Sequence, residues 1–140
     1  MENTQQIMLE FLQKHELGVI STIHTDRNAP ESAVVGFANN DKLELVFGTS
    51  NTTRKYTNIQ NNPHISFVIG WNGAIGTLQY EGVARELASE EAGPYIQLLT
   101  TKTEASKRFI TFPDQRYFVV KPTWIRLQDN INSRLHELSF

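Results

Sequence analysis

The sequence contains no cysteine among its 140 residues, which excludes disulfide bonds, thiolate catalysis and cysteine-based metal sites. It has no apolar run of the roughly 18 residues that a membrane-spanning helix needs. Its amino-terminal segment has no basic stretch followed by a long apolar core, as a signal peptide would. The net charge of −2 and the pI of about 6.1 provide no positive field for nucleic acid. We therefore expect a soluble, cytoplasmic protein that binds neither nucleic acid nor membrane.

The length and composition favour a single domain, residues 1–140. Hydrophobic residues make up 39% of the chain, and eight Phe, four Tyr and two Trp are spread along it. A chain of this size buries a core without help from a metal or a disulfide, and its aromatic content argues against disorder. The sequence contains no internal repeat and no linker.

Short segments rich in β-branched and aromatic residues alternate with turn residues along the chain. They predict strands at residues 17–24, 31–38, 42–49, 64–71, 77–87 and 117–127. Helices are expected at residues 4–15, in the segment before Pro63, and at residues 89–101 and 104–110. Strands that follow one another at hairpin spacing, with few helices, indicate a mainly β fold: an antiparallel barrel or a strongly curled sheet.

Local patterns add detail to this sheet. Asn39–Asp41 predicts a short hairpin turn between residues 31–38 and 42–49, the second of which alternates so that one face is buried. Gly82 predicts a bulge or a close backbone approach, and Pro122 an edge or bulge position. The tail, residues 129–140, gives no clear pattern.

One window of the sequence is short of acids. No Asp or Glu occurs in the 36 residues between Glu44 and Glu81, where an even spread of 15 acids would place about 4. Arg54 and Lys55 fall in this window, at the expected start of a helix, where carboxylates are favoured over cations. Neither cation therefore has a carboxylate partner nearby in the sequence.

The surroundings of this pair suggest an anion site. Arg and Lys suit phosphate, nearby hydroxyls come from Thr49, Ser50, Thr52 and Thr53, and a helix start offers unpaired backbone N–H groups. A phosphate monoester is the most natural ligand, and a solvated turn is the alternative interpretation. Gly48 leaves room for a flat ligand near a shelf of small residues, 32–35, so we predict a phosphorylated cofactor with a planar head, a flavin.

The order of these segments resembles the pyridoxamine 5'-phosphate oxidase-like, FMN-binding split barrels, from about Leu17 to Asp129. The most specific part is a strand ending in Gly48–Thr49, a loop, Arg54–Lys55 opening a helix, and an Asn-Pro pair before the next strand. Gly82-Val83-Ala84 matches a further strand motif of the family. The resemblance implies an antiparallel, Greek-key-like split β-barrel of six or so strands with a few peripheral helices.

The resemblance also implies a set of cofactor-binding residues. Arg54 and Lys55 would hold the FMN phosphate, and Thr77, with Gln79 as a substitute, would reach the flavin. Family members are usually homodimers with FMN between the subunits, where Trp124 of the second chain would contribute. The predicted set is Ser32, Ala33, Val34, Val35, Phe47, Gly48, Thr49, Thr53, Arg54, Lys55, Thr77, Gln79 and Trp124.

The implied activity is that of an FMN-dependent oxidoreductase acting on an unidentified small molecule, with NADH or NADPH as a candidate electron donor. We assign no catalytic side chain and no metal site. The family's carboxy-terminal arginine segment is matched here only by Arg134, so a true pyridoxamine-phosphate oxidase is not expected. Three alternatives stay open: a flavin-binding carrier or sensor without turnover, a haem-binding relative, and an oligonucleotide-binding barrel.

Overall fold

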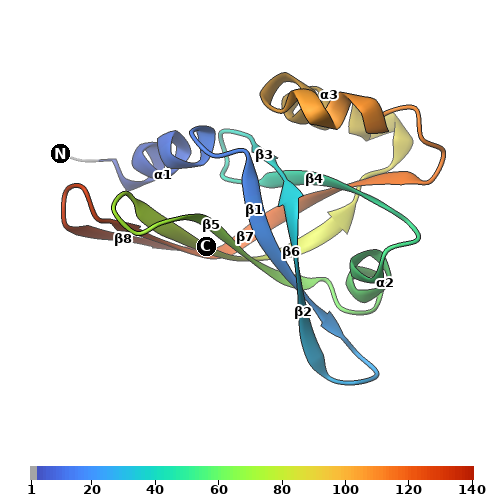
Figure 1. The fold of residues 1–140 in the computed structure, drawn as a ribbon, viewed down its shortest axis with the longest axis horizontal. Helices are drawn as coiled ribbons and strands as arrows, with labels where there is room; N and C mark the ends of the chain where they lie inside the picture. The colour runs from blue at the N-terminus through green and yellow to red at the C-terminus, as the bar shows by residue number, and fades with distance from the viewer. Residues whose placement is uncertain (1–2) are drawn as a thin grey trace.

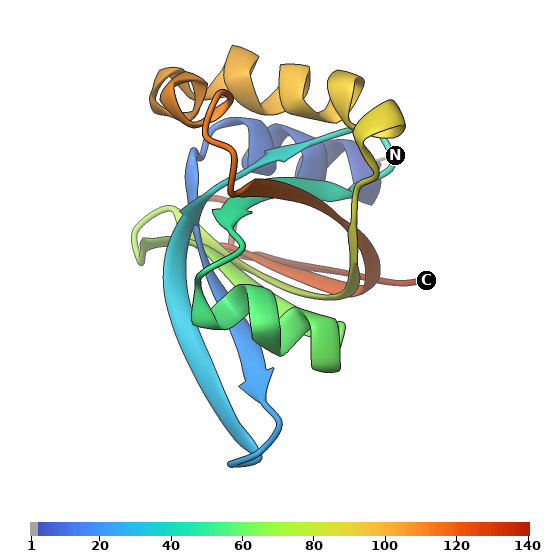
Figure 2. The same cartoon turned by 90° about the vertical axis from the view of Figure 1, so that its right-hand side faces the viewer.

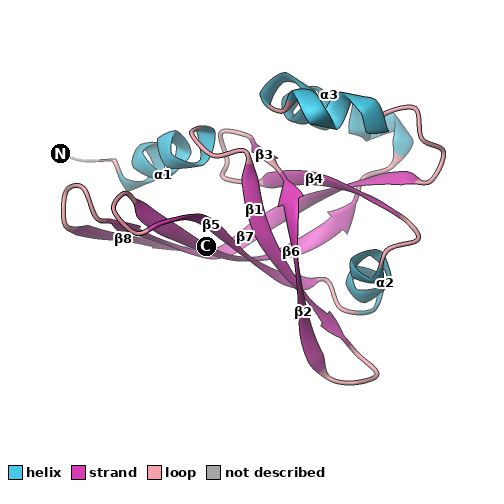
Figure 3. Cartoon of the chain, in the orientation of Figure 1, coloured by secondary structure: helices cyan, strands magenta, loops and turns pink. Residues whose placement is uncertain are grey.

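The chain forms one antiparallel sheet that curls into a split barrel, with helices on its outside (Figure 1). This computed structural model describes residues 3–140. The elements are α1 (Thr4–Gln13), β1 (Leu17–His24), β2 (Ala29–Gly36), β3 (Ala38–Asn39), β4 (Leu45–Ser50), α2 (Arg54–Asn61), β5 (His64–Asn72), β6 (Gly76–Glu86), α3 (Ser89–Lys102), a 3-10 helix (Glu104–Phe109), β7 (Gln115–Asp129) and β8 (Arg134–Ser139). Figure 3 shows the predominance of strands. The predicted mainly β split barrel is therefore confirmed, with more strands than the six or so expected.

The strand order brings distant segments together. Neighbouring strands run in the order β2–β1–β5–β6–β7–β4–β3, and β8 pairs with β7. The first part of β7, residues 115–120, pairs with β4, and the second part, residues 124–129, pairs with β8. Although β2 and β4 lie near opposite ends of this order, the curled sheet brings them into contact.

The pairing of residues 31–38 differs from the sequence prediction. These residues and residues 42–49 do not flank one hairpin, because β2 pairs along its whole length with β1. Only the two-residue β3 pairs with β4. The side chain of Asn40 accepts hydrogen bonds from the backbone N–H groups of Lys42 and Glu44, and Leu43 has a positive φ of 63°. Residues 41–43 therefore form a turn, and β4 starts later than predicted.

The bulge expected at Gly82 and Pro122 is confirmed. The register of β6 against β7 shifts between Glu81 and Gly82, where Gly82 pairs with Pro122. A Cβ atom on Gly82 would lie 2.6 Å from the carbonyl oxygen of Lys121, so only glycine fits this close approach. Pro122 lies at this bulge and between the parts of β7 that pair with β4 and with β8, a position that tolerates its missing N–H.

The core fills the barrel and continues outside it, under α3. The largest side chains inside the barrel are fully buried: Phe37, Phe47, Phe67, Tyr80 and Phe118. A second cluster lies between the sheet and α3: Ala38, Val46, Leu87, Ala92, Leu99, Tyr117 and Val119. Figure 2 shows α3 running over β3 and β4. Both faces of β4 are therefore buried, where the sequence pattern indicated one.

The helices predicted at residues 4–15, 89–101 and 104–110 are confirmed as α1, α3 and the 3-10 helix. The tail, left unassigned from the sequence, contributes β8, whose His136 is buried against the barrel. Within residues 3–140, no helix has the length and apolar character required to cross a membrane.

Candidate functional site

Arg54 and Lys55 are the first two residues of α2, as the sequence predicts. Thr53 is the N-cap, and its Oγ1 accepts a hydrogen bond from the backbone N–H of Tyr56 at 3.3 Å. No acidic side chain lies in the first turn. Because the start of a helix itself carries partial positive charge, this end of α2 attracts anions.

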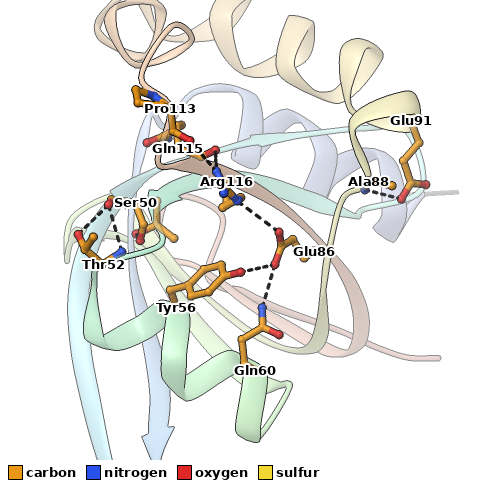
Figure 4. A network of polar contacts seen from close by, with 11 residues as sticks. Ser50, Thr52, Tyr56, Gln60, Glu86, Ala88, Glu91, Pro113, Gln115 and Arg116 are labelled. Carbon is orange, nitrogen blue, oxygen red and sulfur yellow. Dashed lines mark hydrogen bonds and ion pairs between the residues drawn. The ribbon is translucent and has the colours of Figure 1, made fainter.

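The hydroxyl groups before α2 hold the loop in shape. Thr49 Oγ1 lies 2.9 Å from Thr53 Oγ1, which donates to the carbonyl of Ser50 at 2.9 Å. Ser50 Oγ donates to Asp114 Oδ2 at 2.5 Å and lies 2.7 Å from Thr52 Oγ1; Figure 4 shows the contact between Ser50 and Thr52. This hydrogen bond from Ser50 is the main reason that the pKa of Asp114 is lowered. The hydroxyls therefore position the loop, and the two cations dominate its charge.

A cavity of about 480 Å³ opens between the start of α2 and the β1–β2 hairpin. This volume lies within the range of about 300–1,000 Å³ that is usual for small-molecule sites. The cavity is lined by Ile20, Thr22, Glu31, Ser32, Ala33, Thr52, Thr53, Arg54 and Lys55. Five of the predicted residues therefore surround one cavity: Ser32, Ala33, Thr53, Arg54 and Lys55.

Arg54 has a carboxylate partner, which corrects the expectation that neither cation has one. Its guanidinium contacts Glu31 of β2, and the same carboxylate oxygen accepts from Arg27 at 2.6 Å. The other oxygen of Glu31 accepts a hydrogen bond from Asn58 Nδ2 at 2.8 Å. The acid-free window of the sequence could not reveal this contact, because Glu31 reaches the cavity from another strand.

The two cations differ in their electrostatic surroundings. Lys55 is partly buried, and no carboxylate within residues 3–140 forms an ion pair with it. Burial lowers the pKa of the Lys55 ammonium group, because the charged form loses water. The pKa of Glu31 is lowered too, chiefly by the hydrogen bond from Asn58 and further by the charges of Arg54 and Arg27. An anion bound in the cavity would therefore give Lys55 the ion-pair partner that it lacks among residues 3–140.

A polar network fixes α2 against the sheet (Figure 4). The Tyr56 hydroxyl donates to Glu86 Oε1 at 2.8 Å, and Gln60 Nε2 donates to the same oxygen at 2.9 Å. Arg116 of β7 lies 3.8 Å from the other oxygen of Glu86. The hydrogen bond with Glu86 raises the pKa of Tyr56. Both turns of α2 are thus tied to β6, so the position of the two cations is set by the barrel.

A second cavity, of about 310 Å³, lies farther along β2. It is lined by Glu16, Leu17, Gly36, Gly48, Leu99, Thr103, Glu104, Ala105, Ser106, Phe109, Gln115 and Tyr117. A Cβ atom on Gly48 would lie 2.5 Å from Gln115 Nε2 and 2.9 Å from the ring of Tyr117. These two side chains therefore fill the space over Gly48 that the sequence suggested for a ligand. Gly48 borders the second cavity and does not line the first.

Three of the predicted residues lie inside the protein. Val35, Phe47 and Thr49 are at most 8% exposed. Phe47 stacks on Phe118, with ring centroids 5.3 Å apart, and lines neither cavity. These residues support the site from the core.

Five of the predicted residues share the outer face of the sheet. Side chains paired across neighbouring strands point to the same face. One row of paired residues is Val34, Val19, Val68, Gln79 and Arg126, and the next is Ser32, Ser21, Ser66, Glu81 and Trp124. Thr77 lies two residues before Gln79 on β6 and so has the same orientation. Thr77, Gln79 and Trp124 do not line the cavity at Arg54.

Sequence reasoning missed Thr22, Glu31 and Asn58. Asn58 is 4% exposed and bridges the two others, with its Nδ2 3.0 Å from Thr22 Oγ1 and 2.8 Å from Glu31 Oε1. A signal for Glu31 was present, because it precedes Ala33 and Val35 at the two-residue spacing of one strand face. No local pattern marks Asn58, which is buried only through tertiary packing.

Comparisons with known proteins agree with the split-barrel fold. A family model described as pyridoxamine 5'-phosphate oxidase matches residues 4–129 of the chain. A comparison with curated protein sequences gives no match.

Several solved structures are similar to this one. A heme binding protein from Mycobacterium smegmatis superposes with a TM-score of 0.85 at 15% identity, covering 99% of this chain and 59% of that chain. General Stress Protein 26 from Bacillus anthracis gives 0.74 at 22% identity, covering 96% and 98% of the two chains. HutZ, a heme storage protein from Vibrio cholerae, gives 0.73 at 18% identity, covering 86% and 91%. The present chain spans less than two thirds of the mycobacterial protein, and at these identities the likeness concerns the fold.

Proposed function

We propose, from the premise that this chain belongs to the pyridoxamine 5'-phosphate oxidase family, that it is an FMN-binding flavoprotein. The observation that carries the proposal is the cavity at the start of α2, where Arg54 and Lys55 meet small residues of β2. A phosphate monoester fits this arrangement, because a guanidinium, an ammonium group and a helix start favour a compact anion. We further propose that the protein is an oxidoreductase acting on a small molecule.

The spacing of the two cavities supports a ligand with a phosphate at one end and a ring at the other. Ala33 lines the cavity at Arg54, and Gly36 lines the second cavity. Three residues of strand span about 10 Å. In the proposed complex, Arg54 and Lys55 hold the phosphate, while β2 directs the rest of the ligand towards Gly36 and the second cavity.

The chain's own residues contribute binding and orientation. When bound, the flavin would supply hydride transfer, with NADH or NADPH as a candidate donor. The cations neutralise the phosphate, and the network around Glu86 keeps α2 in place. No side chain is assigned as a general acid or base.

The test is the visible spectrum of freshly purified protein, followed by titration with FMN and with riboflavin. We expect flavin absorption bands and an affinity for FMN that clearly exceeds the affinity for riboflavin, because only FMN carries the phosphate. Equal affinity for both, or binding of neither, would contradict the proposal. Reduction of the bound flavin by NADH or NADPH, and its reoxidation by an acceptor, would separate an enzyme from a carrier.

Haem binding is the second candidate, since two similar structures are a heme binding protein and a heme storage protein. The same spectrum decides between the candidates. A Soret band on addition of haem, together with no response to FMN, would favour a haem-binding carrier.

We also propose that the protein forms a homodimer through the outer face of the sheet. Val34 is 60% exposed and Val68 39% exposed there, and Val19 lies between them. A second copy on this face would cover these apolar side chains. In the proposed dimer, Gln79 and Trp124 of that copy would lie near the bound ligand.

For this interface, we expect Val34→Arg to convert a dimer of twice 16.0 kDa into a monomer of 16.0 kDa. A buried arginine without a partner is costly at the centre of an apolar contact. Ile131→Arg is the matched control, because Ile131 is 69% exposed and lies in the β7–β8 turn. Sedimentation equilibrium measures both masses. A monomeric wild-type protein, or a dimeric Val34→Arg variant, would contradict this interface.

A further inference from the structure

The anion cavity already contains an anion of the protein itself. Glu31 lines the cavity together with Arg54 and Lys55, and its carboxylate contacts the guanidinium of Arg54. A phosphate that approaches Arg54 therefore meets a carboxylate that occupies the same donor groups. Electrostatic repulsion between the two anions adds to this competition.

The two partners of this ion pair are held very differently. The side chain of Glu31 is 20% exposed, and its Oε1 is fixed by Asn58, which is itself buried. The side chain of Arg54 is 69% exposed, and Glu31 is its ion-pair partner. Arg54 is therefore the mobile member, and Glu31 stays in place when Arg54 turns away.

Glu31 does not depend on Arg54 for neutralisation. Arg27, from the turn before β2, pairs with it at 2.6 Å. From α2, Asn58 donates to it. Arg54 can consequently exchange the carboxylate for a ligand phosphate without leaving Glu31 unpaired.

We propose that Glu31 is an internal competitor for the phosphate site, which binds Arg54 when the site is empty and is exchanged for a phosphate monoester when the ligand enters. This inference rests on the proposed function. Its consequence is a phosphorylated ligand that is held weakly enough to exchange with the solution, because part of the binding free energy is used to break the pair between Arg54 and Glu31.

The test compares the wild-type protein with Glu31→Gln, which keeps the shape and an acceptor for Asn58 but removes the charge. We expect Glu31→Gln to bind FMN about fivefold more tightly. This factor corresponds to the upper end of the free energy that an exposed ion pair contributes. Riboflavin affinity should stay the same, since riboflavin has no phosphate. Glu90→Gln, on α3, removes the same charge far from the cavity and should change neither affinity.

Unchanged or weaker FMN binding by Glu31→Gln would overturn the inference, and weaker binding would identify Glu31 as a residue that positions Arg54. Glu31→Ala should change FMN affinity in the same direction, which covers the case in which the glutamine variant folds poorly. If neither the wild-type protein nor any variant binds FMN, the proposed function is wrong, but the inference about Glu31 can still be tested. Thermal shift with inorganic phosphate then decides the inference: greater stabilisation of Glu31→Gln than of wild type supports it, and equal stabilisation overturns it.

Discussion

Replacement of Arg54 and Lys55 together by alanine is expected to give a folded protein that binds FMN about 100-fold more weakly than wild type. A hydrogen bond to a charged group contributes about 1.5–3 kcal/mol, so the lower value for each of two cations gives about 3 kcal/mol. Each 1.4 kcal/mol corresponds to about a factor of ten in affinity. Titration of the apoprotein with FMN, followed by flavin fluorescence, measures the effect.

The fold should tolerate this change. The side chain of Arg54 is 69% exposed, and an exposed ion pair such as that with Glu31 contributes little to stability. Glu31 keeps its contacts with Arg27 and Asn58. The thermal midpoint of the double variant should therefore stay close to that of wild type.

Two controls separate phosphate recognition from a general effect of charge. Lys14→Ala with Lys42→Ala removes the same net charge at two exposed positions that line neither cavity, and should leave FMN affinity unchanged. Riboflavin should bind the Arg54 and Lys55 double variant as it binds wild type. FMN binding that survives in the double variant would place the phosphate elsewhere.

The features of the fold that could be predicted from the sequence are local. The start of α2 was predicted because capping residues precede Arg54, and Thr53 is the N-cap. The bulge was predicted because proline cannot donate a hydrogen bond to a strand ladder, and because glycine inside a strand often marks a bulge or a close backbone approach. Both signals come from the conformational preferences of the residues themselves, which act within a few positions of the chain.

The features that could not be predicted depend on contacts between distant segments. Ser32 to Val35 appeared to pair with the strand of Gly48, but β2 pairs with β1 and meets β4 only because the whole sheet curls. β8 escaped notice because it is short and takes its register from β7. Phe47 was among the cofactor-binding residues that the family resemblance implied, yet its ring stacks on Phe118 in the core.

The candidate site follows the same division. Sequence reasoning found the cations, because an acid-free window around Arg54 and Lys55 is visible along the chain. It missed Glu31 because acid-free describes distance along the sequence, and β2 places that carboxylate against Arg54 from 23 residues away. It missed Asn58 because burial of a polar residue in a polar helix depends on what packs against it.

The second large effect is expected in the core that supports α2. Phe118 is fully buried, stacks on Phe47 at 5.3 Å, and meets the ring of Tyr56 of α2 edge-on at 5.8 Å. We expect Phe118→Ala to lower the free energy of unfolding by about 3–5 kcal/mol, because it removes buried surface and leaves a cavity. Denaturation by urea with linear extrapolation measures the loss. FMN affinity should fall as well, because Tyr56 loses part of its support.

Phe112→Ala is the control for this prediction, since Phe112 is 49% exposed and contacts Phe109 in the segment before β7. The free energy of unfolding of Phe112→Ala should lie within about 0.5 kcal/mol of wild type, as for most surface substitutions. Phe118→Leu preserves most of the volume and should cost less than about 1.5 kcal/mol, so it tests FMN binding in a folded protein. A Phe118→Ala variant no less stable than Phe112→Ala would contradict the expectation that Phe118 stabilises the core beneath α2.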